Sequence, residues 1–290
     1  AVTTGGAVCG NSAAIRTMEL LAASNSIRPL WVHAPRGVSA VLGANWPDET
    51  AGAFELLRRL SVLTTDRMRW FADARVVWPK PTHLAKPKRT LRLARLRHAG
   101  AWDPEPAGIE RLTWSLASEK RIRLQHGVVD AAGLRVSDFP VCWLTGTDAP
   151  ALSTDDMAAL RRYLQAGGTL IIDAAGGGKP MQDWFDRFAA TLGKMDSLSA
   201  DEEKMRLAMG PYLLPSVRYT PAAASKLIKS QRRRAQLDIL RIKDRPAVIF
   251  SHIDLAAALV GYPLAGLEAY HPDDAKALLA NLIANSTPEE

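Results

Sequence analysis

The segment 138–178 constrains the fold of this chain more than any other part of the sequence. It contains, in order, an apolar run at 141–144, a break at 145–148, an amphipathic stretch, a glycine pair at 167–168 and a second apolar run at 169–172. Short apolar runs of this kind are typical of strands that are covered on both faces. The order of strand, helix and strand therefore predicts a parallel α/β sheet.

The helix between these two strands has recognisable ends. Ser153, with Asp156 three residues later, resembles a capping box. Met157, Leu160 and Leu164 then recur at helical spacing and form one apolar stripe. The glycine pair that follows supplies the left-handed stop with which many helices end.

The same alternation continues on both sides of this segment. Further strands are predicted at 91–98, 122–129 and 247–251. Proline followed by two acidic residues at 272–274 is a favourable start for a last helix. The stretch 197–230 has a weak pattern broken by prolines, and we expect an irregular excursion there. We therefore predict a three-layer α/β domain with a parallel sheet over residues 88–290.

Composition bounds the class of protein. A chain of 290 residues with 47% hydrophobic and 23% charged residues can bury a large core. No window approaches 18 uninterrupted apolar residues, so contact with a membrane is expected only through parts outside this chain. Two cysteines, Cys9 and Cys142, are too few for a disulfide scaffold or a zinc site of clustered thiolates.

The net charge of +7 is concentrated in the segments 80–98 and 226–243. Such basic segments can bind nucleic acid. No known nucleic-acid motif accompanies them, so we expect a solvated basic surface and keep nucleic-acid binding as the weaker alternative. Prolines and lysines close together predict a basic linker over 67–87.

The amino-terminal part of the chain repeats the carboxyl-terminal part. Residues 28–32 match 245–249, and residues 38–42 match 255–259. Internal similarity indicates repeated structural units. We expect residues 1–66 to be the tail of an earlier domain of the same type, whose front half would be missing from this chain. The alternative is chance similarity between two strand–helix–helix segments.

Three motifs resemble a known family. They are LRLARLRHAG at 91–100, the tripeptide Trp-Asp-Pro at 102–104, and the series from LTGTD to the triple glycine within 144–178. They are similar to the bacterial family called domain of unknown function 4159, and the resemblance covers roughly 89–285. It implies a class-I glutamine-amidotransferase-like, flavodoxin-like fold. It also implies large, often membrane-anchored or exported proteins, hence the bacterial envelope or periplasm, and no settled activity.

The nucleophile of active amidotransferases is a cysteine at a sharp strand-to-helix turn. Here the strand 169–172 is followed by Asp173 and then by Ala-Ala-Gly, with no cysteine or serine at the turn. Cys142 lies within a predicted strand and Cys9 lies outside the domain. A thiolate needs exposure and a neighbouring base to react. We therefore expect the cysteine mechanism to be absent.

Ligand-binding candidates lie where the predicted strands end, because open α/β sheets bind ligands at their carboxyl edge. The candidates are His98, Trp102, Asp103, Thr145, Gly146, Asp148, Asp173, Gly176, Gly177, Gly178 and His252. Carboxylates and imidazoles among them, together with Asp254, could hold a divalent ion. They come from four different loops with no contiguous ligand motif, so we expect neither a metal nor a cofactor.

Two functions follow from these observations. We expect a non-catalytic binding or assembly module that takes a protein partner or a small ligand at the carboxyl edge of the sheet. The alternative is a hydrolase or metal-dependent enzyme built around Asp148, Asp173 and His252. That alternative predicts a common pocket for these three side chains.

Overall fold

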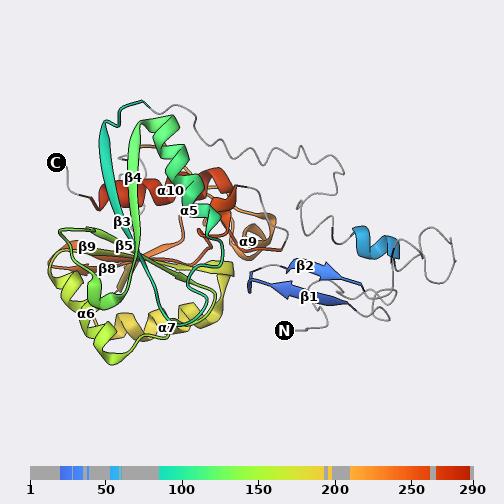
Figure 1. Ribbon diagram of the computed structural model, residues 1–290, viewed down its shortest axis with the longest axis horizontal. Helices are drawn as coiled ribbons and strands as arrows, with labels where there is room; N and C mark the ends of the chain where they lie inside the picture. The colour runs from blue at the N-terminus through green and yellow to red at the C-terminus, as the bar shows by residue number, and fades with distance from the viewer. Residues whose placement is uncertain are drawn as a thin grey trace. The chain divides into compact units, whose positions relative to one another are not determined.

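The computed structural model describes residues 20–27, 29–34, 38, 53–58, 60, 85–192, 195–197, 210–261 and 266–287. The chain divides into two compact units (Figure 1). One unit covers 1–75 with 263–266, and the other covers 76–262 with 267–290.

The second unit is built on a seven-stranded sheet with the order β4-β3-β5-β6-β9-β8-β7. Its strands are β3 (Arg89–Leu96), β4 (Ile122–Val129), β5 (Val141–Gly146), β6 (Thr169–Ala174), β7 (Met195–Ser197), β8 (Leu237–Ile242) and β9 (Arg245–Ser251). The five strands from β4 to β9 in this order run parallel. β8 and β7 continue the sheet antiparallel beyond β9.

Helices cover both faces of this sheet. They are α5 (Ala107–Ser115), which continues as η1 (Leu116–Lys120), α6 (Thr154–Gln165), α7 (Lys179–Ala190), α9 (Pro221–Lys226) and α10 (Pro272–Asn285). The short helices are η2 (Ala131–Gly133), η3 (Ala175–Gly177) and η4 (Ala258–Val260). α6 and α7 lie on one face, and α5 and α10 lie on the other (Figure 1). The predicted three-layer α/β arrangement is therefore confirmed.

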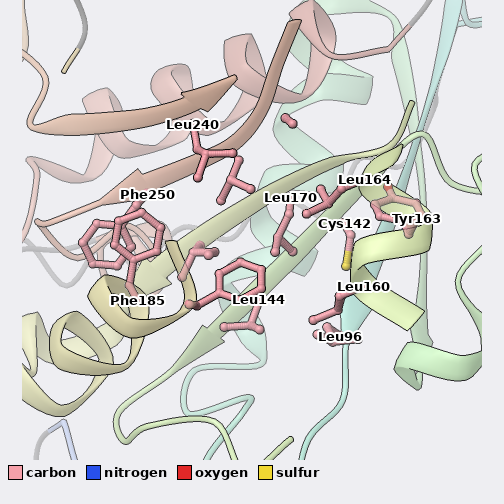
Figure 2. Packing of buried hydrophobic residues seen from close by; sticks show 14 of the residues in the cluster. Leu96, Cys142, Leu144, Leu160, Tyr163, Leu164, Leu170, Phe185, Leu240 and Phe250 are labelled. Atoms are coloured by element: carbon pink, nitrogen blue, oxygen red, sulfur yellow. The ribbon is translucent and has the colours of Figure 1, made fainter. Parts of the chain in front are cut away.

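The face toward α6 and α7 carries the main hydrophobic core. Alternate residues of the central strands point into it, among them Cys142, Leu144, Leu170 and Phe250 (Figure 2). The ring of Phe185 from α7 stacks on Phe250 with a centroid distance of 4.1 Å. Each fully buried side chain of this size contributes about 2–3 kcal/mol through removal of apolar surface from water.

The signals at the ends of α6 have the expected geometry. The Ser153 hydroxyl accepts a hydrogen bond from the Asp156 amide at 3.1 Å, and the Asp156 carboxylate accepts one from the Ser153 amide at 3.0 Å. Gly167 has a φ of 108°, in the left-handed region. Both features were predicted from the sequence, and they fix the direction in which the chain enters β6.

The antiparallel edge of the sheet was not predicted. β8 lies within the basic segment 226–243, whose charge obscured its apolar alternation. Its hairpin with β9 turns at Lys243 and Asp244, with φ values of 51° and 61°. A two-residue turn with both φ values positive usually carries Asn-Gly or Asp-Gly. The pair Lys243-Asp244 therefore did not indicate a hairpin turn. The helix α9 likewise lies inside the stretch expected to be irregular.

The first unit contains a smaller sheet. β1 (Leu21–Ser24) and β2 (Pro29–His33) pair antiparallel, and residues 53–58 are helical. Leu20 beside the hairpin and Leu56 in the helix are buried in one cluster. Cys9, most of the predicted linker 67–87 and much of the predicted tail 1–66 lie outside the described residues. Among the residues described, no helix is long and apolar enough to cross a membrane.

Candidate functional site at the carboxyl ends of the strands

Asp173 ends β6 on the face opposite the main core and is completely buried. Its Oδ1 accepts a hydrogen bond from the Leu255 amide at 2.8 Å, and its Oδ2 accepts one from the Ala256 amide at 2.9 Å. The Thr145 hydroxyl, from the neighbouring strand β5, lies 3.2 Å from the same Oδ2. The carboxylate therefore joins two strand ends to the loop that follows β9.

Asp254 is the second buried carboxylate of this edge. Its Oδ1 accepts a hydrogen bond from the Ala257 amide at 2.8 Å, and its Oδ2 accepts one from the Gly176 amide. Gly176 lies in η3, immediately after β6, and has a φ of 76°, a value that glycine adopts without strain. All four oxygens of the two carboxylates, Asp173 included, are thus occupied by donors of the chain itself.

The two carboxylates influence each other's protonation. Burial raises the pKa of Asp173 to about 6, although its hydrogen bonds oppose the rise. Burial also raises the pKa of Asp254, and the nearby negative charge of Asp173 raises that pKa further. Glu105, which is itself buried, acts on the pKa of Asp254 in the same direction. Perturbed carboxylates of this kind occur at functional sites and in structural networks alike.

His98 and Gly146 pack against each other at the ends of β3 and β5. The His98 ring is buried, with Nε2 3.1 Å from the Thr145 carbonyl oxygen and Nδ1 3.2 Å from the Ala99 carbonyl oxygen. A Cβ at position 146 would lie 3.2 Å from His98 Nε2. The ring thus faces two backbone carbonyls, and its nitrogens are engaged with the chain itself.

Arg95 brings together two of the predicted residues. Its guanidinium forms an ion pair with Asp103 and lies 5.2 Å from the centre of the Trp102 ring. Only 9% of the Arg95 side chain is exposed. Arg95 was not among the predicted site residues, although alternation along β3 places it on the same face as the buried Leu91 and Leu93. An arginine at a strand position that shares its face with apolar residues was the signal that could have identified Arg95 as a site residue.

Two buried N–H groups on the neighbouring strands β3 and β5 have no acceptor among the described residues. They are Arg95 Nε and the indole Nε1 of Trp143. Arg95 of β3 and Trp143 of β5 are register partners, so their side chains lie next to each other on the same face. Most buried polar groups in proteins have a hydrogen-bond partner. Trp143 was not among the predicted site residues.

The glycine loop after β6 is shaped by close contacts. Gly177 has a φ of 71°, and a Cβ at this position would lie 3.1 Å from the Glu268 side chain. A Cβ at Gly178 would lie 2.9 Å from the Thr147 carbonyl oxygen. The loop is therefore held against the segment after β5 and against Glu268. Asp148, which follows Thr147, is exposed and pairs with the Thr147 hydroxyl at 3.3 Å.

His252 lies on the other face of the sheet from Asp173. Its Nδ1 is 2.7 Å from Gln182 Oε1 of α7, and its Nε2 is 2.7 Å from Asp238 Oδ2 of β8. Its ring meets Phe250 of the main core edge-on, with a centroid distance of 4.8 Å. The histidine therefore belongs to the α7 side, whereas Asp173 contacts the loop after β9.

The structure does not group the metal-binding types among the predicted residues. Within the described part of the chain, no three or more His, Cys, Asp or Glu side chains are placed so that they could hold a metal ion. Thr145, Asp173 and Gly176 are brought together with Asp254. Asp148 and His252 have other partners, as described above.

Cys142 lies in the interior of the sheet. It is completely buried in β5, on the face toward α6, among Leu160, Tyr163 and Leu164 (Figure 2). Burial raises the pKa of its thiol, which keeps the sulfur protonated and unreactive at neutral pH. Cys142 therefore packs as a small hydrophobic residue.

Comparison with known proteins identifies the family. No curated protein matches the chain. The crystal structure of a protein described as ThuA-like, from Bacteroides uniformis ATCC 8492, aligns with 70% of this chain and 92% of its own length. It has 12% sequence identity and a TM-score of 0.32, a likeness too weak to support an argument. The profile of the family described as "Domain of unknown function (DUF4159)" matches residues 92–284, and the chain therefore belongs to this family.

Proposed function

We propose that this protein is a non-catalytic binding module with a flavodoxin-like, class-I glutamine-amidotransferase-like fold. The observation that carries the proposal is the position of Cys142, wholly inside the core and away from the turn after β6. Near the end of β6, just before that turn, lies Asp173, whose two oxygens accept hydrogen bonds from the chain itself. A nucleophile and a base within reach of each other, which covalent catalysis needs, are not supplied by these residues.

The strand order supports the fold proposal. Numbered along the chain, the five parallel strands have the order 2-1-3-4-5, which is that of flavodoxin-like sheets. In such sheets the connections change side between the first and third strands, here β3 and β5. Ligands bind outside the carboxyl ends of the strands at this point.

We place the ligand site at this switch point. Arg95 and Trp143 lie on β3 and β5, and each contributes a buried N–H that has no acceptor in the described part of the chain. Two adjacent donors of this kind suit a ligand oxygen, such as that of a carboxylate or an amide carbonyl. Trp102 and Asp103 lie beside this site, because both contact the guanidinium group of Arg95.

An activity test addresses the non-catalytic part of the proposal. Purified protein should release no ammonia from glutamine and should not hydrolyse p-nitrophenyl acetate above a heat-denatured blank. Cys142→Ala tests the cysteine directly, and Cys9→Ala is the matched control. Turnover that is lost in Cys142→Ala and kept in Cys9→Ala would refute the proposal.

The ligand site has a separate test, because an indole N–H gives its own nuclear magnetic resonance signal. The signal of Trp143, assigned by its loss in Trp143→Phe, should shift saturably when acetate or glutamine is added. Trp184 on α7, stacked on Phe188 on the opposite face, serves as the control and should not shift. Equal, non-saturating shifts of both signals would argue against a ligand oxygen at the switch point.

A further inference from the structure

The small hairpin of the first unit has the same register as the β8–β9 hairpin of the second. Ser24 pairs with Pro29 in one, and Arg241 pairs with Pro246 in the other. Ser24 and Arg241 are 217 positions apart, as are the two prolines. In both hairpins the register shifts at the same place, just before the residue that pairs with the proline. Bulges are positional features of related strands, so this agreement indicates equivalent hairpins.

The turns of the two hairpins share one left-handed position. Ser26 has a φ of 72° and Lys243 has a φ of 51°, and these residues are again 217 positions apart. Left-handed φ values are uncommon for residues other than glycine. Their occurrence at equivalent places in two turns of equal length supports a common origin of the two hairpins.

The helix that follows each hairpin has a buried alanine and a buried leucine at the same spacing. Ala53 and Leu56 of the first unit are 0% and 2% exposed, and Ala275 and Leu278 of α10 are both 0% exposed. The two residues of each pair are three positions apart, and each lies 222 positions from its counterpart. Because 222 exceeds 217 by five, the segment between hairpin and helix is five residues longer in the second unit.

The two hairpins differ in what covers them. In the second unit, Val248 and Phe250 of β9 are fully buried, because β6 pairs with β9 in parallel and Phe185 of α7 stacks on Phe250. Their counterparts in β2 are Trp31 and His33. Trp31 is 56% exposed, and its ring stacks on the exposed His33 at 5.4 Å. Among the described strands, β2 pairs with β1 alone.

We infer that residues 20–60 are the carboxyl-terminal part of a second α/β domain. The open edge of β2 pairs with a parallel strand, as β9 pairs with β6. The helix that follows this strand covers the face that bears Trp31 and His33, as α7 covers Phe250 of β9. The polypeptide that supplies this strand and helix lies amino-terminal to residue 1 and corresponds to residues 89–217 of the second unit. This inference does not depend on whether the switch point between β3 and β5 binds a ligand.

The chemistry of the open surface fits this occupant. An unpaired strand edge presents a row of backbone N–H and C=O groups that a further strand can pair with. A large exposed aromatic side chain beside such an edge favours an apolar cover. In the second unit the equivalent positions receive the apolar strand β6 and an aromatic residue of α7.

Hydrogen exchange tests the inference on the intact chain and on the product extended upstream in the same reading frame. In the extended protein, amides of β2 should exchange at least about tenfold more slowly than in the 290-residue chain, because paired backbone amides are protected. Amides of β9 are the control and should exchange equally in both. Unchanged exchange in β2, or a reading frame without an upstream counterpart of 89–217, would overturn the inference.

A variant separates cover of the surface from general stabilisation. Trp31→Glu should leave the unfolding midpoint of the 290-residue chain unchanged, because the side chain is already more than half exposed. In the extended protein it should return exchange in β2 to the rate of the shorter chain. Equal effects of Trp31→Glu in both proteins would show that no upstream segment covers this face.

Discussion

The buried carboxylates at the strand ends should make the domain less stable as the pH rises from about 4 to about 7. The folded chain holds the pKa of Asp173 at about 6, against 3.8 without burial. Between these values the folded chain binds more protons than the unfolded chain, so stability falls with increasing pH. A difference of about two pKa units corresponds to about 3 kcal/mol, and Asp254, whose pKa is also raised, acts in the same direction.

Urea unfolding at constant ionic strength, followed by circular dichroism, measures this dependence. Asp173→Asn cannot ionise, and its Asp254 neighbour is relieved of a like charge. The variant should lose much less stability across the range than the wild type, although its free energy of unfolding at pH 4 is lower because one hydrogen-bond acceptor is lost. Asp155→Asn removes an exposed carboxylate of α6 and is the control. Equal pH dependence in the wild type and Asp173→Asn would refute the reasoning.

Two further predictions concern packing, and urea unfolding measures both. Gly168→Ala should destabilise the domain by about 1–3 kcal/mol, because a Cβ there would lie 2.3 Å from the buried ring of Tyr163; an unchanged midpoint would mean that the ring has room to move. Phe185→Ala should cost about 3–5 kcal/mol, since the ring is fully buried against Phe250; a loss below about 1 kcal/mol would contradict the described core.

Much of the second unit could be predicted because its local signals agree with its fold. The strand β4 has the predicted bounds, 122–129, and α10 begins at the predicted Pro272. The central strands are apolar because helices cover both of their faces. The edge strand β8 was not predicted, because its apolar residues are interspersed with polar ones inside a basic segment. Its turn also uses Lys243 and Asp244 where glycine would have marked it.

The candidate site was predictable only in part. The order of the elements placed Thr145, Asp173 and Gly176 correctly at strand ends, and these residues do lie together. It could not assign hydrogen-bond partners such as the Leu255 and Ala256 amides, because those depend on the path of the loop after β9.

The face of the sheet decides which strand-end residues can act together. Side chains alternate between faces along a strand, so two candidates that end neighbouring strands can still point in opposite directions. Asp173 pairs in register with Ser251, and the next residue, His252, turns to the α7 side, where it meets Gln182. By the same alternation, Arg95 and Trp143 share one face because they are register partners. Position and face together therefore favour the β3–β5 switch point, rather than Asp173 with His252, as the place where a ligand would bind.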